Sequence, residues 1–125
     1  MKRVIALRGA TTVSKNSEVE IKYASIELFS EIIKKNNIEL EDIISVEISC
    51  TKDINKAYPG KFIREYFKLD HTAIMHFNEM EVDKSLNGFI PLCIRLLILV
   101  DVNKTKKEFV YLNNAKKLRK DLLNK

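Results

Sequence analysis

The sequence predicts an α+β fold, a mixed β-sheet of about five strands covered on one face by a long helix and a short helix. In five segments, apolar and polar residues alternate or β-branched apolar residues form a run, as is typical of strands. Two further segments lie between the first three of these predicted strands and carry apolar residues at helical spacing. At 125 residues, without repeats or a linker-like stretch, the chain is expected to form a single domain over residues 1–125.

The first strand is expected over Arg3 to Thr12, where alternation puts Arg8 on the same face as Val4 and Ala6. A capping box, Ser17 to Glu20, then starts a long helix that ends near Asn36. Its apolar positions recur at helical spacing: Ile21, Ala24, Leu28 and Ile32. We expect this helix to cover the sheet.

The second strand is expected over Ile44 to Cys50. Its residues separate into an apolar face (Ile44, Val46, Ile48 and Cys50) and a polar face (Ser45, Glu47 and Ser49). Alternation of this kind is typical of a strand with one face in the core.

The segment from Tyr58 to Lys68 is typical of a short helix with Pro59 in its first turn. Spacings of three and four residues gather three cations on one side and leave aromatic and apolar residues for packing. The cations are Lys61, Arg64 and Lys68, and the packing residues are Phe62, Ile63, Tyr66 and Phe67. The basic stripe is either an ordinary solvated surface or the rim of an anion site, to which the helix N-terminus would contribute.

A third strand is expected over residues 72 to 80 and ends at Glu79. Strict alternation places His76 and Glu79 on opposite faces, so they share a site only if a bulge intervenes. No second His, Cys or Asp stands near His76 at the spacing of metal ligands, and no metal site is expected.

One charge interrupts the apolar run from Ile90 to Val100, which is too short for a membrane span and suits a strand buried on both faces. The charge is Arg95, whose guanidinium stays ionised and needs an anion when it is buried. That anion is either a carboxylate of the same chain or a ligand. Arg8, just before Gly9, is a second candidate for binding an anion, with a surface arginine as the alternative.

Beyond this strand, Lys104 to Lys107 is expected to form a turn. Glu108 to Leu112 is expected to form the last strand, which carries Tyr111, and the basic tail after it to be partly helical.

The net charge of +5 and the pI near 9.2 could suit a nucleic-acid partner, but the distribution of charge does not. Most of the 22 basic residues are lysines spread along the chain, and only five are arginines: Arg3, Arg8, Arg64, Arg95 and Arg119. This pattern favours a solvated lysine surface and marks each arginine as a place where a fixed bidentate donor is needed.

The two cysteines, Cys50 and Cys93, lie in apolar strand-like runs outside any CxxC motif, so they are expected to be buried and reduced. The apolar stretch near the N-terminus, V-I-A-L, is far shorter than that of a signal peptide. These observations predict a cytoplasmic protein without a membrane association.

The chemistry open to this sequence is electrostatic. It has no Ser/His/Asp set, no cysteine with a plausible base, no paired acidic dyad, no P-loop and no dinucleotide fingerprint. What remains is Arg8, Arg95, Glu79 and Tyr111 on strands, with a Lys/Arg helix nearby. Such a set can hold a polyanion in a fixed shape and stabilise charge without covalent catalysis and without a cofactor.

Six short motifs span essentially the whole chain: L-R-G-A-T-T-V, Y-P-G-K-F-I-R, N-E-M-E-V, C-I-R, V-Y-L and L-R-K-D-L. Their order and separations resemble those of the monofunctional chorismate mutases of the trimeric pseudo-α/β-barrel class. The resemblance implies a homotrimer whose sheets pack together, with sites between subunits. It also implies an isomerase that converts chorismate to prephenate, a Claisen rearrangement in aromatic amino acid biosynthesis. Such an enzyme selects the compact conformer of chorismate and stabilises negative charge at the ether oxygen.

By position, the resemblance makes Arg95 the cation at the ether oxygen and Arg8 the ligand of the enolpyruvyl carboxylate. Tyr111 would hydrogen-bond to the substrate near that carboxylate, and Glu79 would hold the ring hydroxyl and face the developing positive charge. A second set would bind the substrate: Tyr58, Lys61, Arg64, Met75, His76, Leu118 and Arg119. His76 stands where the family has a cysteine that contacts the ring hydroxyl.

Two alternatives stay open. One is a trimeric small-carboxylate-binding or imine-deaminase-like protein, which also uses an interfacial arginine, and Tyr111 and Glu79 argue against it. The other is a basic nucleic-acid-binding domain, and the scattered lysines argue against that.

Overall fold

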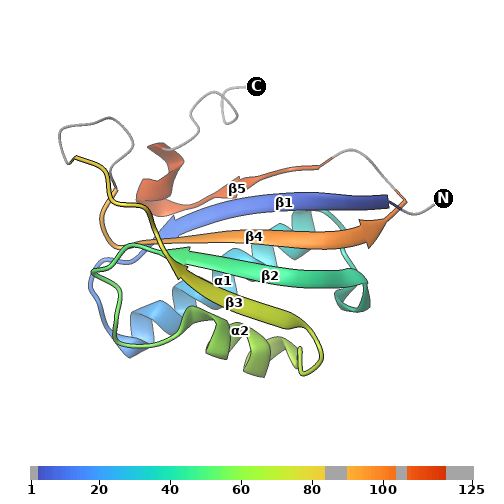
Figure 1. Ribbon diagram of the computed structural model, residues 1–125, viewed down its shortest axis with the longest axis horizontal. Coiled ribbons are helices and arrows are strands. Elements are labelled where there is room, and N and C mark those ends of the chain that lie inside the picture. Colours follow the sequence, from blue (N-terminus) through green and yellow to red (C-terminus); the bar gives the residue numbers. More distant parts are fainter. Residues whose placement is uncertain (1–2, 84–89, 104–106, 118–125) are drawn as a thin grey trace.

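A computed structural model describes residues 3–83, 90–103 and 107–117, and has the predicted α+β architecture (Figure 1). In chain order the elements are β1 (Arg3–Thr12), α1 (Glu18–Lys35), η1 (Leu40–Asp42), β2 (Ile43–Cys50), α2 (Pro59–Phe67), β3 (Ala73–Asn78), β4 (Cys93–Val102), β5 (Val110–Tyr111) and η2 (Asn113–Lys117). Both η1 and η2 are short 3-10 helices.

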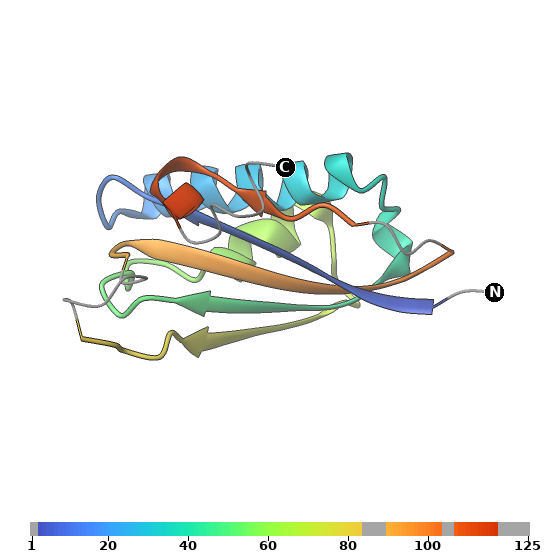
Figure 2. The same cartoon turned by 90° about the horizontal axis from the view of Figure 1, so that it is seen from above.

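The strands form one mixed sheet in the order β3-β2-β4-β1-β5. β4 pairs antiparallel with β1 and β2, whereas β3 pairs in parallel with β2, and β5 in parallel with β1. Both α-helices, α1 and α2, lie on the same side of the sheet (Figure 2). In the described part of the chain no helix lies on the other side, which we call the open face.

The long helix α1 forms where the apolar spacing predicts it. Ile21, Leu28 and Ile32 are fully buried against the sheet, so the predicted packing face is confirmed. Ser17 is the N-cap and accepts a hydrogen bond from the Glu20 N–H (3.3 Å). The capping box is only half formed, because the Glu20 carboxylate turns away and accepts from the Ser14 N–H (3.1 Å) and hydroxyl (2.6 Å) instead.

Alternation along β4 divides the apolar run between the two faces. Ile94, Ile98 and Val100 are fully buried toward the helices, while Leu97 on the open face is 37% exposed. The expectation that this strand is buried on both faces is therefore wrong for a single chain, because no element of the described residues covers the open face.

A register shift changes the start of β2. Ile43 pairs with Val100 and Ser45 pairs with Leu99, so Ile44 is an extra residue between them. Ile43 therefore points into the core and Ile44 is 45% exposed, contrary to the predicted alternation, which holds from Val46 onward.

The short helix α2 begins at Pro59 as predicted and places Phe62 and Ile63 in the core. Tyr66, expected among the packing residues, is 64% exposed, and only the edge of its ring meets Phe67 (centroids 4.9 Å apart). The last strand, β5, has two residues rather than five, and η2 is the helical part of the tail that lies within the described residues.

Candidate active site

One row of side chains crosses the open face and contains two of the predicted site residues, Arg95 and Tyr111. Successive strand pairings align Phe77 with Ser49, Ser49 with Arg95, Arg95 with Ala10 and Ala10 with Tyr111. Residues directly opposite one another on paired strands present their side chains to the same face. The sheet register therefore brings Arg95 and Tyr111 to one region, on either side of the small Ala10.

Arg95 meets a carboxylate of its own chain. Its Nε lies 3.2 Å from Glu79 Oε1, and the Arg95 side chain is 35% exposed. That Nε is buried and makes no hydrogen bond, so Glu79 acts on it as a neighbouring charge. Of the two anions expected for Arg95, the structure contains the internal one, and the exposed part of the guanidinium leaves room for a ligand as well.

Glu79 is held from two sides. It follows the last residue of β3, and its N–H donates to the carbonyl of Cys50 (2.8 Å). The Ser49 hydroxyl donates to Glu79 Oε1 (2.7 Å), the same oxygen that faces Arg95. Ser49 was not among the predicted site residues. Alternation assigns it to the polar face of β2, but its pairing with Arg95 depends on the sheet register, which the sequence does not reveal.

Arg8 and Tyr111 complete this group. Arg8 lies two residues before Ala10 on β1, hence on the same face, and is exposed with its guanidinium carbon 4.9 Å from the centre of the Phe109 ring. Tyr111 is 7% exposed and packs with Ala10 and Cys93. Two arginines, a carboxylate and a phenol thus share the open face, an arrangement suited to binding a ligand with more than one carboxylate.

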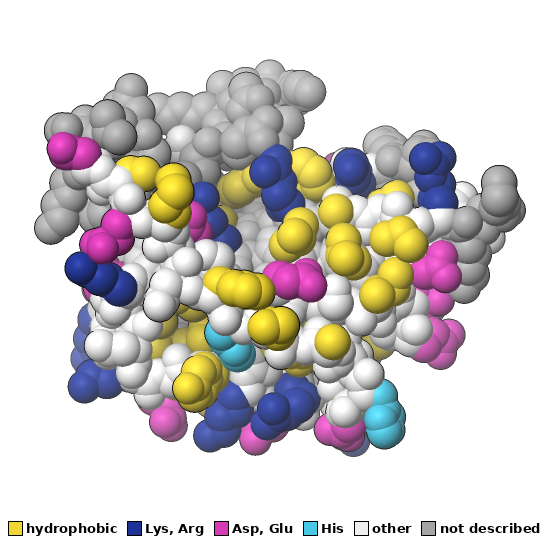
Figure 3. Space-filling view, in the orientation of Figure 1, with side chains coloured by type: hydrophobic (Ala, Val, Ile, Leu, Met, Phe, Trp, Pro, Cys, Tyr) yellow, Lys and Arg dark blue, Asp and Glu magenta, His cyan; other side chains and the backbone are white. Residues whose placement is uncertain are grey.

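The second predicted set lies elsewhere, at the β3 edge of the sheet. Lys61 and Arg64 are exposed on α2, on the opposite side of the sheet from Arg95. Lysine and arginine side chains gather along the lower edge of the molecule, where Figure 1 places α2 (Figure 3). Met75 is 59% exposed on the open face, while Tyr58 is 69% exposed at the start of α2. The sheet separates the cations of α2 from Arg95, so the two predicted sets of residues do not meet within one chain.

Comparisons with known proteins identify what this arrangement is. A sequence model of the family chorismate mutase type I matches residues 4–122. The chorismate mutase AroH of Bacillus subtilis is 33% identical over 93% of this chain and 90% of its own length. The AroH of Thermus thermophilus is 30% identical over 95% of this chain and 96% of its own. The chain belongs to the chorismate mutase type I family.

A solved structure supports the same assignment. A chorismate mutase from Clostridium thermocellum superposes with a TM-score of 0.82 and 39% sequence identity, over 90% of this chain and 97% of that one. The predicted family, the α+β fold and the enzyme class, an isomerase, are confirmed. Of the functions predicted from the sequence, these findings favour chorismate mutase over a carboxylate-binding or nucleic-acid-binding protein.

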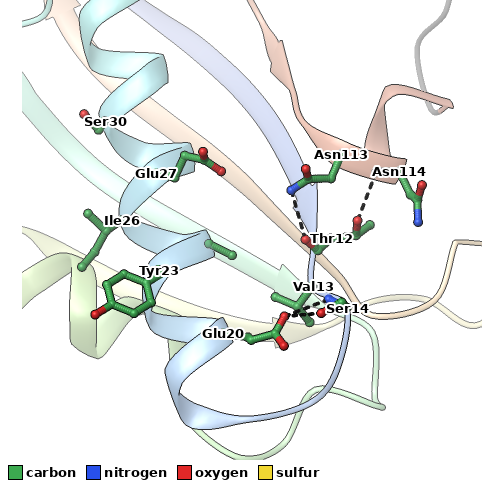
Figure 4. Close-up of a pocket in the computed structure, with 11 residues that line it drawn as sticks. Thr12, Val13, Ser14, Glu20, Tyr23, Ile26, Glu27, Ser30, Asn113 and Asn114 are labelled. Carbon is green, nitrogen blue, oxygen red and sulfur yellow. Dashed lines mark hydrogen bonds between the residues drawn. The ribbon is translucent and has the colours of Figure 1, made fainter.

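One hollow of this chorismate mutase chain lies away from the arginines. A cavity of about 850 Å³ lies between α1, the end of β1 and η2 (Figure 4). Glu20 and Glu27 line it together with Thr12, Asn113 and Asn114, and neither Arg95 nor Glu79 reaches it. The negative charge of Glu20 and Glu27 makes this cavity unfavourable for a dianion.

Burial makes both cysteines of this family member poor nucleophiles. Both are free and buried, and burial raises the pKa of the Cys50 thiol to about 12, with further contributions from Cys93 and Glu79. Burial also raises the pKa of Cys93 above its usual value.

Some predictions lie beyond what the structure describes. Leu118 and Arg119 fall outside the described residues, and within those residues there is no cluster of three metal-ligating side chains. In that same part of the chain, no helix is long and apolar enough to cross a membrane.

Proposed function

We propose that this chain catalyses the rearrangement of chorismate to prephenate, in a site that the open face of one copy forms with the β3 edge of another. The observation that carries the proposal is the group on the open face. There, Arg95 is paired with Glu79 and shares the face with Arg8 and Tyr111. Family membership supplies the reaction, and this group supplies the charges that the reaction needs.

The reaction itself requires little chemistry from the protein. It is intramolecular, so no covalent intermediate, metal or proton shuttle is needed. As the C–O bond of chorismate breaks, negative charge grows on the ether oxygen while the ring becomes electron-poor. An enzyme accelerates it by holding the compact conformer and by placing fixed charges where the transition state develops them.

The roles follow from the charges. Arg95 donates to the ether oxygen and stabilises the charge that develops there, while Arg8 binds the enolpyruvyl carboxylate. Tyr111 donates a hydrogen bond near that carboxylate. Glu79, oriented by Ser49, accepts from the ring hydroxyl and faces the electron-poor ring. The pair of Glu79 with Arg95 also keeps the guanidinium oriented before the substrate arrives.

The neighbouring copy contributes the second set. Its members close the other side of the site: Tyr58 before α2, Lys61 and Arg64 of α2, and Met75 and His76 of β3. The resemblance assigns Leu118 and Arg119 to substrate binding as well. Two features support an assembly of this kind, which in this family we take to be a homotrimer. The helix α2, which carries Lys61 and Arg64, lies on the other side of the sheet from the open face that carries Arg95. The open face also exposes large apolar side chains, namely Val4 (58%), Met75 (59%), Phe77 (50%) and Leu97 (37%), which Figure 3 shows spread across the sheet.

We also place this enzyme in the cytoplasm. Its two cysteines are unpaired and buried, as is usual in a reducing compartment.

The direct test follows the loss of chorismate absorbance with purified protein, beside Arg95→Ala and Arg95→Lys prepared in the same way. We expect rapid turnover by the wild type and a loss of about 100-fold or more in kcat for both variants. Alanine removes the charge, and lysine keeps the charge but lacks the paired N–H donors of the guanidinium. Folding should change little, because Arg95 is partly exposed. Wild-type turnover in Arg95→Lys would contradict the role of Arg95, and an inactive wild type would contradict the proposed function.

A further inference from the structure

His76 makes a contact that its predicted role does not explain. It lies on β3 with its side chain toward the helices, and its Nε2 accepts a hydrogen bond from the Gly60 N–H of α2 (2.9 Å). Its ring also faces Tyr58, with centroids 5.1 Å apart and planes inclined by 58°. His76 therefore touches the first turn of α2, the helix that carries the cations of the second set.

This first turn has few other ways to satisfy its amide groups. The first N–H groups of a helix have no partner within it, and a side chain at the N-cap normally supplies one. Here the N-cap is Tyr58, whose side chain makes no capping hydrogen bond, and Pro59 has no N–H. His76 thus caps α2 from a neighbouring strand.

Gly60 allows the ring to come this close. A Cβ at residue 60 would lie 2.8 Å from His76 Cε1 and 2.9 Å from Nε2, and 2.8 Å from Ile74 Cγ2. The Nε2–Cε1 edge of the imidazole therefore rests directly on the helix backbone, and a side chain at this position would push it away.

The hydrogen bond fixes the protonation state of His76. Nε2 can accept from an N–H only if it carries no proton, so the ring is neutral with its proton on Nδ1. Its surroundings favour this form. Burial lowers the pKa of His76 below its usual value. Three titratable groups line the cavity beside His76, namely Tyr58 at the N-cap of α2, Lys56 of the preceding loop and Cys50 of β2. Among the described residues, no carboxylate lines this cavity.

We propose that His76 is a positioning residue that holds the first turn of α2, and with it Tyr58 and Lys61, in the geometry that binds substrate, and does so only while it is neutral. The inference rests on the proposed function. It differs from the role that the resemblance implies, in which the residue at this position contacts the ring hydroxyl, because here Nε2 is already engaged by Gly60.

Protonation would reverse the contact. A proton on Nε2 would face the Gly60 N–H as donor against donor, and the imidazolium would meet the positive end of α2. The first turn of α2 would then shift, and Tyr58 and Lys61 would bind the substrate less tightly. We expect the KM for chorismate to rise about fivefold between pH 7.5 and pH 5, the effect of losing about one hydrogen bond, with kcat changed much less.

The test measures KM and kcat from pH 5 to pH 8 for the wild type, His76→Gln and His76→Leu. Glutamine can accept from Gly60 but does not titrate, so its KM should stay nearly flat over this range. Leucine cannot accept, so its KM should be raised at every pH. His71, Glu79 and the substrate carboxylates are the same in all three proteins, so the difference between the profiles belongs to His76.

A second readout does not depend on turnover. In an NMR titration of the wild type, the Gly60 amide resonance should move with the protonation of His76, and in His76→Gln it should not. An unmoved Gly60 resonance, or wild-type and His76→Gln profiles of KM that coincide, would overturn the inference while turnover persists. An inactive wild type would instead refute the proposed function and this role with it.

Discussion

Ser49 of β2 contacts the proposed catalytic pair of Glu79 and Arg95. Its hydroxyl donates to Glu79 Oε1 (2.7 Å), and that oxygen is 3.2 Å from Arg95 Nε. In Ser49→Ala, Glu79 would keep its charge but lose the bond that orients it. We expect kcat to fall about tenfold with KM little changed, since a hydrogen bond to a charged group contributes about 1.5–3 kcal/mol.

Steady-state kinetics of Ser49→Ala beside Ser49→Thr would measure this effect. Threonine keeps the hydroxyl donor and should retain most of the activity. Equal kcat for the alanine variant and the wild type would show that Glu79 does not need Ser49.

The two thiols offer a test of burial. Because burial raises the pKa of Cys50 to about 12 and also raises that of Cys93, almost no thiolate exists at pH 8. Iodoacetamide at pH 8 should therefore label the folded protein far more slowly than the protein in urea, without loss of activity. Rapid labelling of the folded protein by mass spectrometry would mean that these residues are more accessible than the structure shows.

At the scale of residues, the sequence indicated the site residues that interrupt a local pattern. It did not indicate the residues whose role depends on how the strands pair. Arg95 stands out because it is a charge within an apolar run, and alternation correctly placed His76 and Glu79 on opposite faces. Ser49 looks like an ordinary polar residue until the register aligns it with Arg95. The contact of His76 with Gly60 joins residues 16 positions apart, and no local pattern indicates it.

At the scale of elements, β1 meets α1 and β5 at a glycine. A Cβ at Gly9 would lie 2.7 Å from Ile32 Cδ1 and 2.8 Å from the carbonyl oxygen of Val110. We expect Gly9→Ala to lower the free energy of unfolding by about 1–3 kcal/mol, the usual cost of overpacking a core. Urea denaturation would measure it.

The double variant Gly9→Ala/Ile32→Val gives that prediction a control. Valine lacks the Cδ1 atom that the new methyl group meets, so the two changes together should cost less than the sum of the single changes. Strict additivity would show that Ile32 is not what limits the space at Gly9.

Elements were predicted more reliably than their details. The apolar spacing of α1 and the position of Pro59 in α2 indicated both helices correctly. The register shift at Ile44 was not predictable, because I-I-S-V allows either isoleucine to face the core. The same holds for Tyr66, whose amphipathic side chain suits either the packing face or the surface.

At the scale of the whole molecule, the proposed site is divided between two sides of the sheet. The open face carries Arg8, Arg95, Glu79 and Tyr111, while the cations of α2 lie behind the sheet. The sequence could indicate these residues but not their separation, which depends on the side of the sheet that α2 occupies. The sequence of β4 is apolar on both faces, and this is why it predicts a strand buried on both sides. In the proposed assembly, a second copy would cover the open face.

This division makes the central claim testable by mixing two inactive chains. Arg95→Ala damages the open face and Arg64→Ala damages the α2 edge, so each homogeneous assembly has only defective sites. In a mixed ring of three copies, about a third of the sites combine the intact open face of an Arg64→Ala copy with the intact edge of an Arg95→Ala copy.

The measurement is the chorismate mutase activity of the two variants co-expressed with different tags and purified through both. We predict activity well above that of either variant alone, approaching about a third of the wild-type value, because purification through both tags leaves only mixed assemblies. Activity no greater than the average of the two separate variants, in assemblies shown to contain both chains, would contradict a site shared between copies.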